Sequence, residues 1–143
     1  MKRLRNERGA ALLETAITLP LVLLVTIGAV EFGRAYQTYQ VITNAAREGA
    51  RIAVLPGVND AAVDNRVVDY MSAGQLSAAE EATVTVTRNN PLAIGTGAAT
   101  ASRVVVSYPF TFMVLQPVAQ LVVSGSTVGA PLTMTASALM RNE

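Results

Sequence analysis

The chain has 143 residues, a formal net charge of +1, and neither cysteine nor histidine. This length allows one modest domain, and the missing residue types exclude disulfides, Cys/His metal sites and catalysis by a thiolate or an imidazole. The near-neutral charge also argues against a general nucleic-acid binder. Charge is uneven, because the first nine residues hold four basic side chains against Glu7: Lys2, Arg3, Arg5 and Arg8. A basic head before a neutral body indicates orientation across a membrane.

An uncharged apolar run follows, from Thr15 to Val30. With residues 10–13 before it, the apolar stretch reaches about 20 residues, which is enough for a helix to span a bilayer. The basic residues predict a cytoplasmic N-terminus, with the chain after about residue 31 outside the cytoplasm. A secretory signal would need a small-residue cleavage site after the run, whereas EFGRAYQTYQVITNAAREGARIAV is typical of more helix. A plain signal anchor explains the hydropathy equally well.

Glu14 places a carboxylate inside this apolar stretch. Such a residue costs about 2.5–3.5 kcal/mol at a membrane centre and less near an interface. One interpretation is that Glu14 simply snorkels to the cytoplasmic headgroups. The other takes the residues together, since the basic residues are followed by Gly9, and Glu14 is the fifth residue after that glycine.

This arrangement resembles the processing site of type IV pilin-like precursors, which a membrane aspartic protease, the prepilin peptidase, cuts after the glycine. The resemblance implies cleavage between Gly9 and Ala10, and a positively charged amine on Ala10. Because five residues of helix rise about 7 Å, Glu14 could pair with the Ala10 amine of a neighbouring subunit. Such a pair limits the cost of a buried carboxylate and sets a register for assembly.

The run from Arg8 to Arg51 looks like the TadE-like family of minor pseudopilins from tight-adherence (Tad/Flp) pilus systems. The similarity rests on RGAALLE, TLPLVLL, EFGRAY and NAAREGAR, and more weakly on VSYPF (106–110) and ALMRNE (138–143). One departure is Thr15, where these families more often have an aromatic residue. The resemblance implies a structural subunit that is itself a single-pass inner-membrane protein, with no enzymatic activity and no cofactor. Implied partners are a prepilin peptidase, an inner-membrane assembly platform, other pseudopilins, the major pilin and membrane lipid, with no nucleic acid or small-molecule substrate.

The pattern predicts a helix from Ala10 to about Val54, with a kink at Pro20 and an end at Leu55-Pro56-Gly57. Glu31 and Arg34 are expected to pair on its surface. Small residues four positions apart allow another element to approach closely: Ala45, Gly49 and Ala53, and also Ala46 and Ala50. We expect the exported domain to pack there on its own helix, and packing between subunits is the alternative.

A second helix is predicted from Asn59 or Asp60 to Ala73, with Gly74 ending it. Its apolar stripe should comprise Val63, Val67, Tyr70 and Met71. Alternation then predicts three strands, at 82–88, 103–110 and 132–140, joined by a flexible connection over 89–102. These should form an antiparallel sheet with one face on the long helix, so the expected fold class is α+β and pilin-like.

The segment 110–123 is apolar, and Pro117 could open a short helix in it. We favour side chains that cover the sheet, and contact with the membrane or with a partner subunit is the alternative. The expected organisation is a leader at 1–9, a transmembrane helix at 10–30, its continuation at 31–55 and an exported domain at 56–143.

Catalytic motifs are sparse, since the sequence has no P-loop and no G-x-S-x-G. Carboxylates are the remaining option, and we interpret them as a solvated face: Asp60, Asp64, Asp69, Glu80 and Glu81. The favoured function is a minor pseudopilin that takes part in biogenesis of a Tad/Flp-type pilus or related secretion apparatus. The alternative is a signal-anchored protein whose exported domain binds a ligand or acts as an adhesin. An enzyme with an acidic site ranks last.

Overall fold

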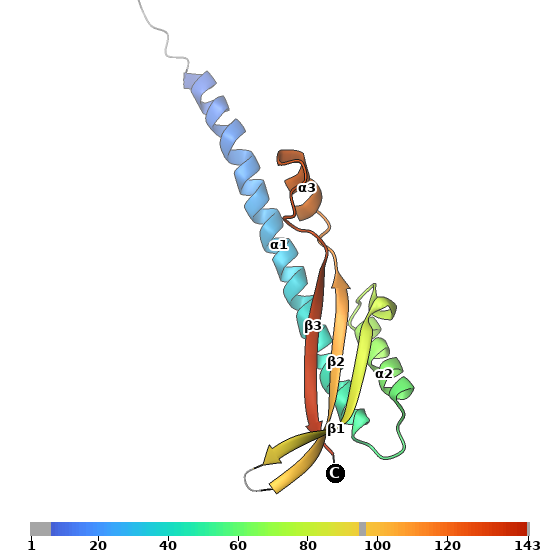
Figure 1. Cartoon of the computed structure of the whole chain (residues 1–143). Helices are drawn as coiled ribbons and strands as arrows, with labels where there is room; N and C mark the ends of the chain where they lie inside the picture. The colour runs from blue at the N-terminus through green and yellow to red at the C-terminus, as the bar shows by residue number, and fades with distance from the viewer. Residues whose placement is uncertain (1–6, 95–96, 143) are drawn as a thin grey trace, which may run out of the picture. The chain divides into compact units, whose positions relative to one another are not determined.

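The computed structural model describes residues 7–94 and 97–142 (Figure 1). A long N-terminal helix, a second helix and a three-stranded antiparallel sheet are present, so the predicted α+β class is confirmed. The elements in chain order are α1 (Glu7–Ala53), α2 (Asp60–Ala73), the short 3-10 helix η1 (Ala79–Glu81), β1 (Thr83–Ile94), β2 (Gly97–Phe110), α3 (Leu115–Val122) and β3 (Leu132–Arg141).

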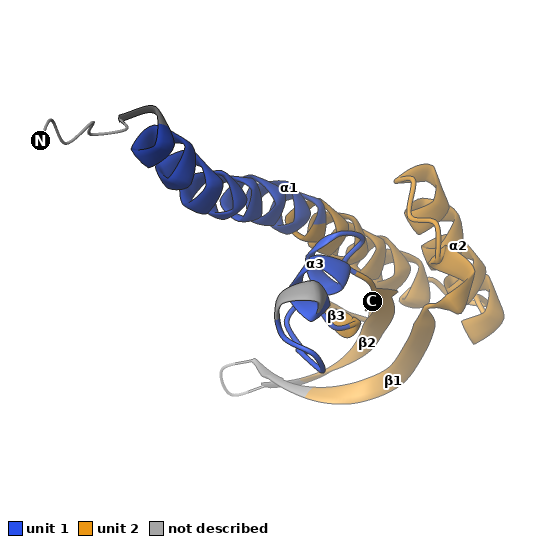
Figure 2. Ribbon diagram, turned by 90° about the horizontal axis from the view of Figure 1, so that it is seen from above, with its two compact units in different colours: residues 1–34, 112–130 blue, residues 35–111, 131–143 orange. Residues whose placement is uncertain are grey.

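The chain divides into two compact units, coloured separately in Figure 2. Residues 1–34 and 112–130 form one, which we call the apolar unit. Residues 35–111 and 131–143 form the other, which we call the sheet unit. Helix α1 contributes residues 7–34, which we call its first half, to the apolar unit, and residues 35–53, which we call its second half, to the sheet unit.

Within the sheet unit, the second half of α1 presents to the core one face that consists of Ile42 and small residues. These residues are almost fully buried and recur three or four positions apart: Ile42, Ala45, Ala46, Ala50 and Ala53. At Gly49 the packing is closest, because a Cβ added there would lie 2.6 Å from Val67 and 3.2 Å from Val104. The small-residue face therefore packs against α2 and β2 of its own chain, as predicted.

Helix α2 has the predicted bounds. The Asn59 side chain caps it by accepting a hydrogen bond of 2.8 Å from the Ala62 N–H. Val63, Val67 and Met71 are buried in the core. Tyr70 was expected in the same stripe but is exposed; it lies at the edge of this stripe, about 100° round the helix from Met71.

The sheet has the order β1-β2-β3, with Val84 opposite Val106 and Val104 opposite Ala138. Alternate residues of β2 are buried, which places one face of this central strand in the core. The prediction of a flexible connection over 89–102 was wrong, since β1 runs to Ile94 and β2 starts at Gly97. This stretch lacks apolar alternation, but pairing of adjacent strands satisfies its backbone groups without it.

A register shift between Thr87 and Asn90 interrupts this hairpin, and Asn89 there has a φ of +58°. Asparagine tolerates the left-handed region better than most residues, which suits a bulge. The strands on either side of the bulge therefore form one long β1–β2 ribbon (Figure 1).

In the apolar unit, α1 remains helical through Pro20. The Phe32 and Phe112 rings meet edge to face, with centroids 6.2 Å apart. Helix α3 follows, and Pro117 is its third residue rather than its first. From Phe112 to Ala130 the chain forms a compact unit with the first half of α1, through the contacts of residues 112–114 with residues 31 and 32.

Candidate functional site

The expected processing residues lie at the start of α1. Gly9 and Ala10 are exposed and fall within its first four residues. Glu14 is exposed one turn further on. Of the basic residues expected to set orientation, Arg8 has helical backbone, and the others lie outside the described residues: Lys2, Arg3 and Arg5.

The first half of α1 exposes an apolar surface. Every residue from Gly9 to Thr26 is exposed, including Leu12, Ile17 and Leu21. The helix holds an 18-residue window with a mean hydropathy of 2.1, none of it buried. By length and composition the helix can cross a membrane. Such a continuous exposed apolar surface is rare on soluble monomers and marks a site of membrane or protein contact.

Immediately after this surface, Glu31 forms a buried polar centre. Its side chain is almost inaccessible, at 4% relative exposure. The carboxylate accepts hydrogen bonds from the backbone N–H groups of Met113, at 3.2 Å, and of Val114, at 3.1 Å. Arg34 donates a further bond of 3.1 Å to the same carboxylate. The predicted pairing of Glu31 with Arg34 is confirmed, but Glu31 is buried rather than on the surface.

The Glu31 carboxylate thus caps α3 from a distant part of the chain. Val114 occupies the N-cap position of α3 and provides no side-chain hydrogen bond. The exposed N–H groups at a helix N-terminus favour a negative charge. A buried carboxylate is costly unless it is hydrogen-bonded and paired, and Glu31 meets both conditions. The sequence signal that could have revealed this role is the absence of any charged residue between Arg103 and Arg141.

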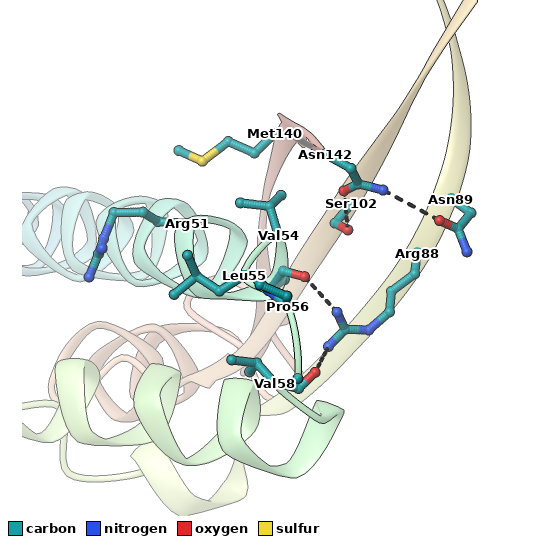
Figure 3. Close-up of a pocket in the computed structure, with 12 residues that line it drawn as sticks. Arg51, Val54, Leu55, Pro56, Val58, Arg88, Asn89, Ser102, Met140 and Asn142 are labelled. Carbon is teal, nitrogen blue, oxygen red and sulfur yellow. Dashed lines mark hydrogen bonds between the residues drawn. The ribbon is translucent and has the colours of Figure 1, made fainter.

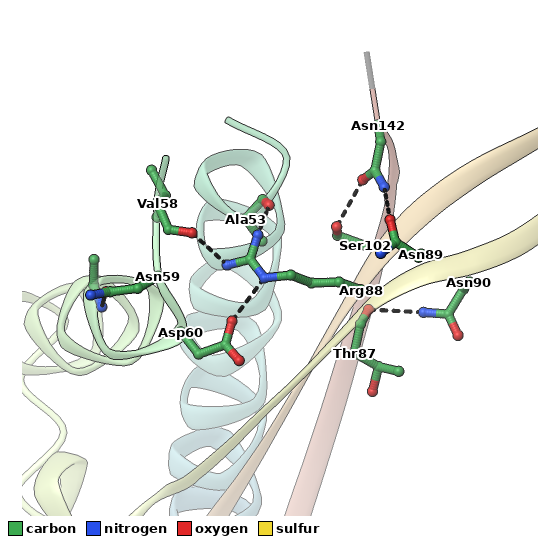
Figure 4. A network of polar contacts seen from close by, with 11 residues as sticks. Ala53, Val58, Asn59, Asp60, Thr87, Arg88, Asn89, Asn90, Ser102 and Asn142 are labelled. Carbon is green, nitrogen blue, oxygen red and sulfur yellow. Dashed lines mark hydrogen bonds and ion pairs between the residues drawn. The ribbon is translucent and has the colours of Figure 1, made fainter. Parts of the chain in front are cut away.

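The sheet unit contains a groove of about 660 Å³ at the end of α1 (Figure 3). Arg88 reaches into this region and donates to the carbonyl oxygens of Ala53, at 2.5 Å, and Val58, at 2.9 Å. Its Nε donates to Asp60 at 2.8 Å (Figure 4). The guanidinium therefore ties the end of α1 and the start of α2 to β1. This arrangement is that of a structural junction.

The other polar side chains of the groove also bind one another. Ser102 donates to Asn142 at 2.8 Å, and Asn142 donates to Asn89 at 3.4 Å (Figures 3 and 4). Arg51, on the groove wall, donates two bonds to Glu48. These contacts occupy the groups that a polar ligand would need. The groove therefore offers little support for the ligand-binding alternative.

The carboxylates considered for catalysis do not gather into one site. Asp60 binds Arg88, and the other four are exposed on α2 or η1: Asp64, Asp69, Glu80 and Glu81. Across residues 7–94 and 97–142, no three acidic residues are grouped so as to hold a metal ion. Their placement agrees with the interpretation of a solvated face.

Over the described part of the chain, these features define a class of protein that combines one helix long and apolar enough to cross a membrane with a small α+β sheet unit. Residues 9–51 match the family model TadE, described as TadE-like protein. The predicted resemblance to the TadE-like family is confirmed over this segment. The family is associated with Tad pilus biogenesis, and its members are generally structural pilus components rather than enzymes. No curated protein and no solved structure matches the chain.

The match ends at Arg51, close to the end of α1. The weaker similarity expected at 106–110 and 138–143 lies outside it. The matched segment therefore contains the apolar surface, Glu31 and the small-residue face, while α2, the sheet and α3 lie beyond it.

Proposed function

We propose that the protein is a minor pseudopilin, a structural subunit that takes part in biogenesis of a Tad/Flp-type pilus or a related secretion apparatus. The observation that carries this proposal is that the family match begins at Gly9 and continues along an exposed apolar helix that contains Glu14. Residues 10–30 cross the cell membrane once. The basic leader keeps the N-terminus cytoplasmic, so residues 31–55 and 56–143 lie on the periplasmic or extracellular side.

Processing removes the basic leader. A prepilin peptidase hydrolyses the amide between Gly9 and Ala10, so that the released leader carries a new carboxylate and Ala10 carries a new ammonium group. The mature chain then loses the charges that anchored its end at the cytoplasmic face. Its first turn then carries a positive charge at the Ala10 amine and a negative charge at Glu14, about 6 Å apart along the helix axis.

Assembly uses this pair of charges. In a bundle of such helices, the Glu14 carboxylate of one subunit accepts a hydrogen bond from the charged Ala10 amine of the next. This ion pair offsets the free-energy cost of removing both groups from water. The pair fixes the axial register, while the apolar side chains supply lateral contact. The partners are the inner-membrane assembly platform, other pseudopilins and the major pilin.

The test is the mature N-terminus, determined by intact mass and N-terminal peptide mapping of the membrane-extracted protein. The native chain should begin at Ala10, and Gly9→Ala should retain the leader. Gly28→Ala is the matched control, because nothing lies within 4 Å of a Cβ added at that helical glycine. Its chain should begin at Ala10 like the native one.

Other starting residues decide between the alternatives. A native chain that begins at Met1 would refute prepilin-type processing and favour the plain signal anchor. A start after about Ala29 would make this a secreted protein. Glu14→Ala tests assembly separately, since it should reduce co-purification with the major pilin even in molecules that begin at Ala10.

A further inference from the structure

Segment 112–130 is apolar and uncharged, yet much of it is exposed. The chain has no charged residue between Arg103 and Arg141. Large apolar side chains before, at the end of, and after α3 face outward, with relative exposures of 69% for Met113, 60% for Val123 and 57% for Val128. Apolar surface of this kind normally faces a partner or a lipid phase.

The segment is fixed to α1 directly after the apolar run. Val30 is the last residue of that run, and the next residue is Glu31, whose carboxylate accepts the N–H groups of Met113 and Val114. The Phe32–Phe112 ring contact adds an apolar link beside it. Both regions belong to the same compact unit. The apolar surface of segment 112–130 therefore continues that of the first half of α1.

The loop after α3, residues 123–130, also packs closely against the start of that helix. Gly129 has a φ of +75°, and a Cβ there would lie 2.7 Å from the Gln116 backbone nitrogen. Only glycine fits this position without strain. The loop after α3 is thus held against the start of that helix, so α3 and its flanking turns form one short, defined element.

We propose that this element, residues 112–130, lies in the outer interface of the bilayer that α1 crosses. The inference rests on the membrane anchoring in the proposed function. Lipid is favoured as the occupant because the surface is continuous with the membrane-spanning run and carries no charge. An eight-residue helix such as α3 is about 12 Å long, which is too short to span but suits a helix lying in the interface.

This placement at the membrane interface explains the role of the buried Glu31. Near the hydrocarbon boundary, the backbone N–H groups of Met113 and Val114, directly before α3, could not rely on hydrogen bonds to water. The Glu31 carboxylate accepts them, and Arg34 compensates its charge on the side away from the apolar run. A low local dielectric strengthens these hydrogen bonds. Glu31 is thus a positioning residue for the interfacial element.

The test attaches an environment-sensitive fluorophore to single cysteines in the full chain, reconstituted in phosphatidylcholine–phosphatidylglycerol vesicles. Because the chain has no cysteine, each label is unique. Labelled positions are Met113→Cys, Val123→Cys and Val128→Cys. Ile17→Cys within the membrane-spanning run is the positive control, and Ser137→Cys, exposed on β3, is the negative control. Lipids with nitroxides on their acyl chains serve as the quencher.

The expected result is blue-shifted emission and quenching at Ile17 and at the three positions around α3, with neither at Ser137. Quenching at Ile17 alone would overturn the inference and leave the membrane anchoring intact. A blue shift without quenching around α3 would also overturn it, because protein would then cover the surface. If Ile17 itself is not quenched, the proposed membrane anchoring fails as well.

A second measurement tests Glu31 directly. Glu31→Ala should reduce quenching of the Met113→Cys label and leave the Ile17→Cys label unchanged. Glu81→Ala, which removes an exposed carboxylate on η1, is the matched control and should change neither. Equal quenching of the Met113→Cys label with and without Glu31 would refute the role of Glu31 in holding this element at the interface.

Discussion

Gly49 allows the sharpest test of the packing in the sheet unit. A Cβ at this position would lie 2.6 Å from Cγ2 of Val67 and 3.2 Å from Cγ1 of Val104. Both valines are fully buried, and their branched side chains have little rotamer freedom. Overpacking costs about 1–3 kcal/mol, while the better helix propensity of alanine returns about 1 kcal/mol. Gly49→Ala should therefore lower the free energy of unfolding by about 1 kcal/mol, and Gly49→Val by more.

The assay is urea unfolding of the full chain in detergent, followed by near-ultraviolet circular dichroism of the buried Tyr108. The matched control is Gly33→Ala, the same change in the same helix, where nothing lies within 4 Å of the added Cβ. The control should leave the midpoint unchanged or slightly raised. If Gly49→Ala changes the midpoint in the same direction and by the same amount as Gly33→Ala, the close packing of α1 against α2 and β2 is refuted.

Two further predictions concern charged groups of the sheet unit. Arg88→Met should lower the free energy of unfolding, measured with urea, by about 2 kcal/mol, because Asp60 and two carbonyl oxygens lose their hydrogen-bond donor. Arg88→Lys should restore only part of this stability, because an ammonium group lacks the planar fork of the guanidinium. If Arg88→Lys were as stable as the native chain, the need for that planar fork would be contradicted. Hydrogen bonds from Arg51 lower the pKa of Glu48 from 4.5 to about 2, against the opposing effect of burial and with a further contribution from Arg66. Because this pKa is depressed, the stabilisation is complete above about pH 4.5 and is lost as the pH falls towards 2. Because solvent screens the exposed arginines, the loss in the free energy of unfolding should be about 1 kcal/mol. Glu48→Gln should make the free energy of unfolding depend less on pH in this range. An unchanged pH dependence in this variant would refute the assignment of the effect to Glu48.

Local signals in the sequence were sufficient to predict the position of several helices and strands. The cap at Asn59 and the stop at Gly74 predicted the bounds of α2, because both act through backbone groups next to them. Alternation predicted the central parts of the strands, since the side chains of a strand face opposite sides of the sheet. The small-residue face of α1 predicted close packing, because only small side chains allow it.

Other helices and strands depended on hydrogen-bond partners from other parts of the chain, which local sequence patterns do not reveal. The stretch 89–102 resembles a loop in composition, yet it pairs as a strand because the neighbouring strand supplies its hydrogen bonds. The helix in 110–123 begins before Pro117, since a proline in the first turn of a helix removes no bond that the helix would otherwise make. In both cases the hydrogen bonding of the backbone decided the structure, and the conformational preference of the individual residues did not.

The sequence by itself determined the class of the protein: a basic head, an apolar run of membrane-spanning length, and the spacing of Gly9 and Glu14, all of which are read along the chain. Only the tertiary structure decided what Glu31 does. Its hydrogen-bond donors at Met113 and Val114 lie 82 and 83 residues away. A carboxylate next to an arginine is an ordinary surface pair in sequence. It becomes a buried helix cap only when folding brings the uncharged N-terminus of α3 to it.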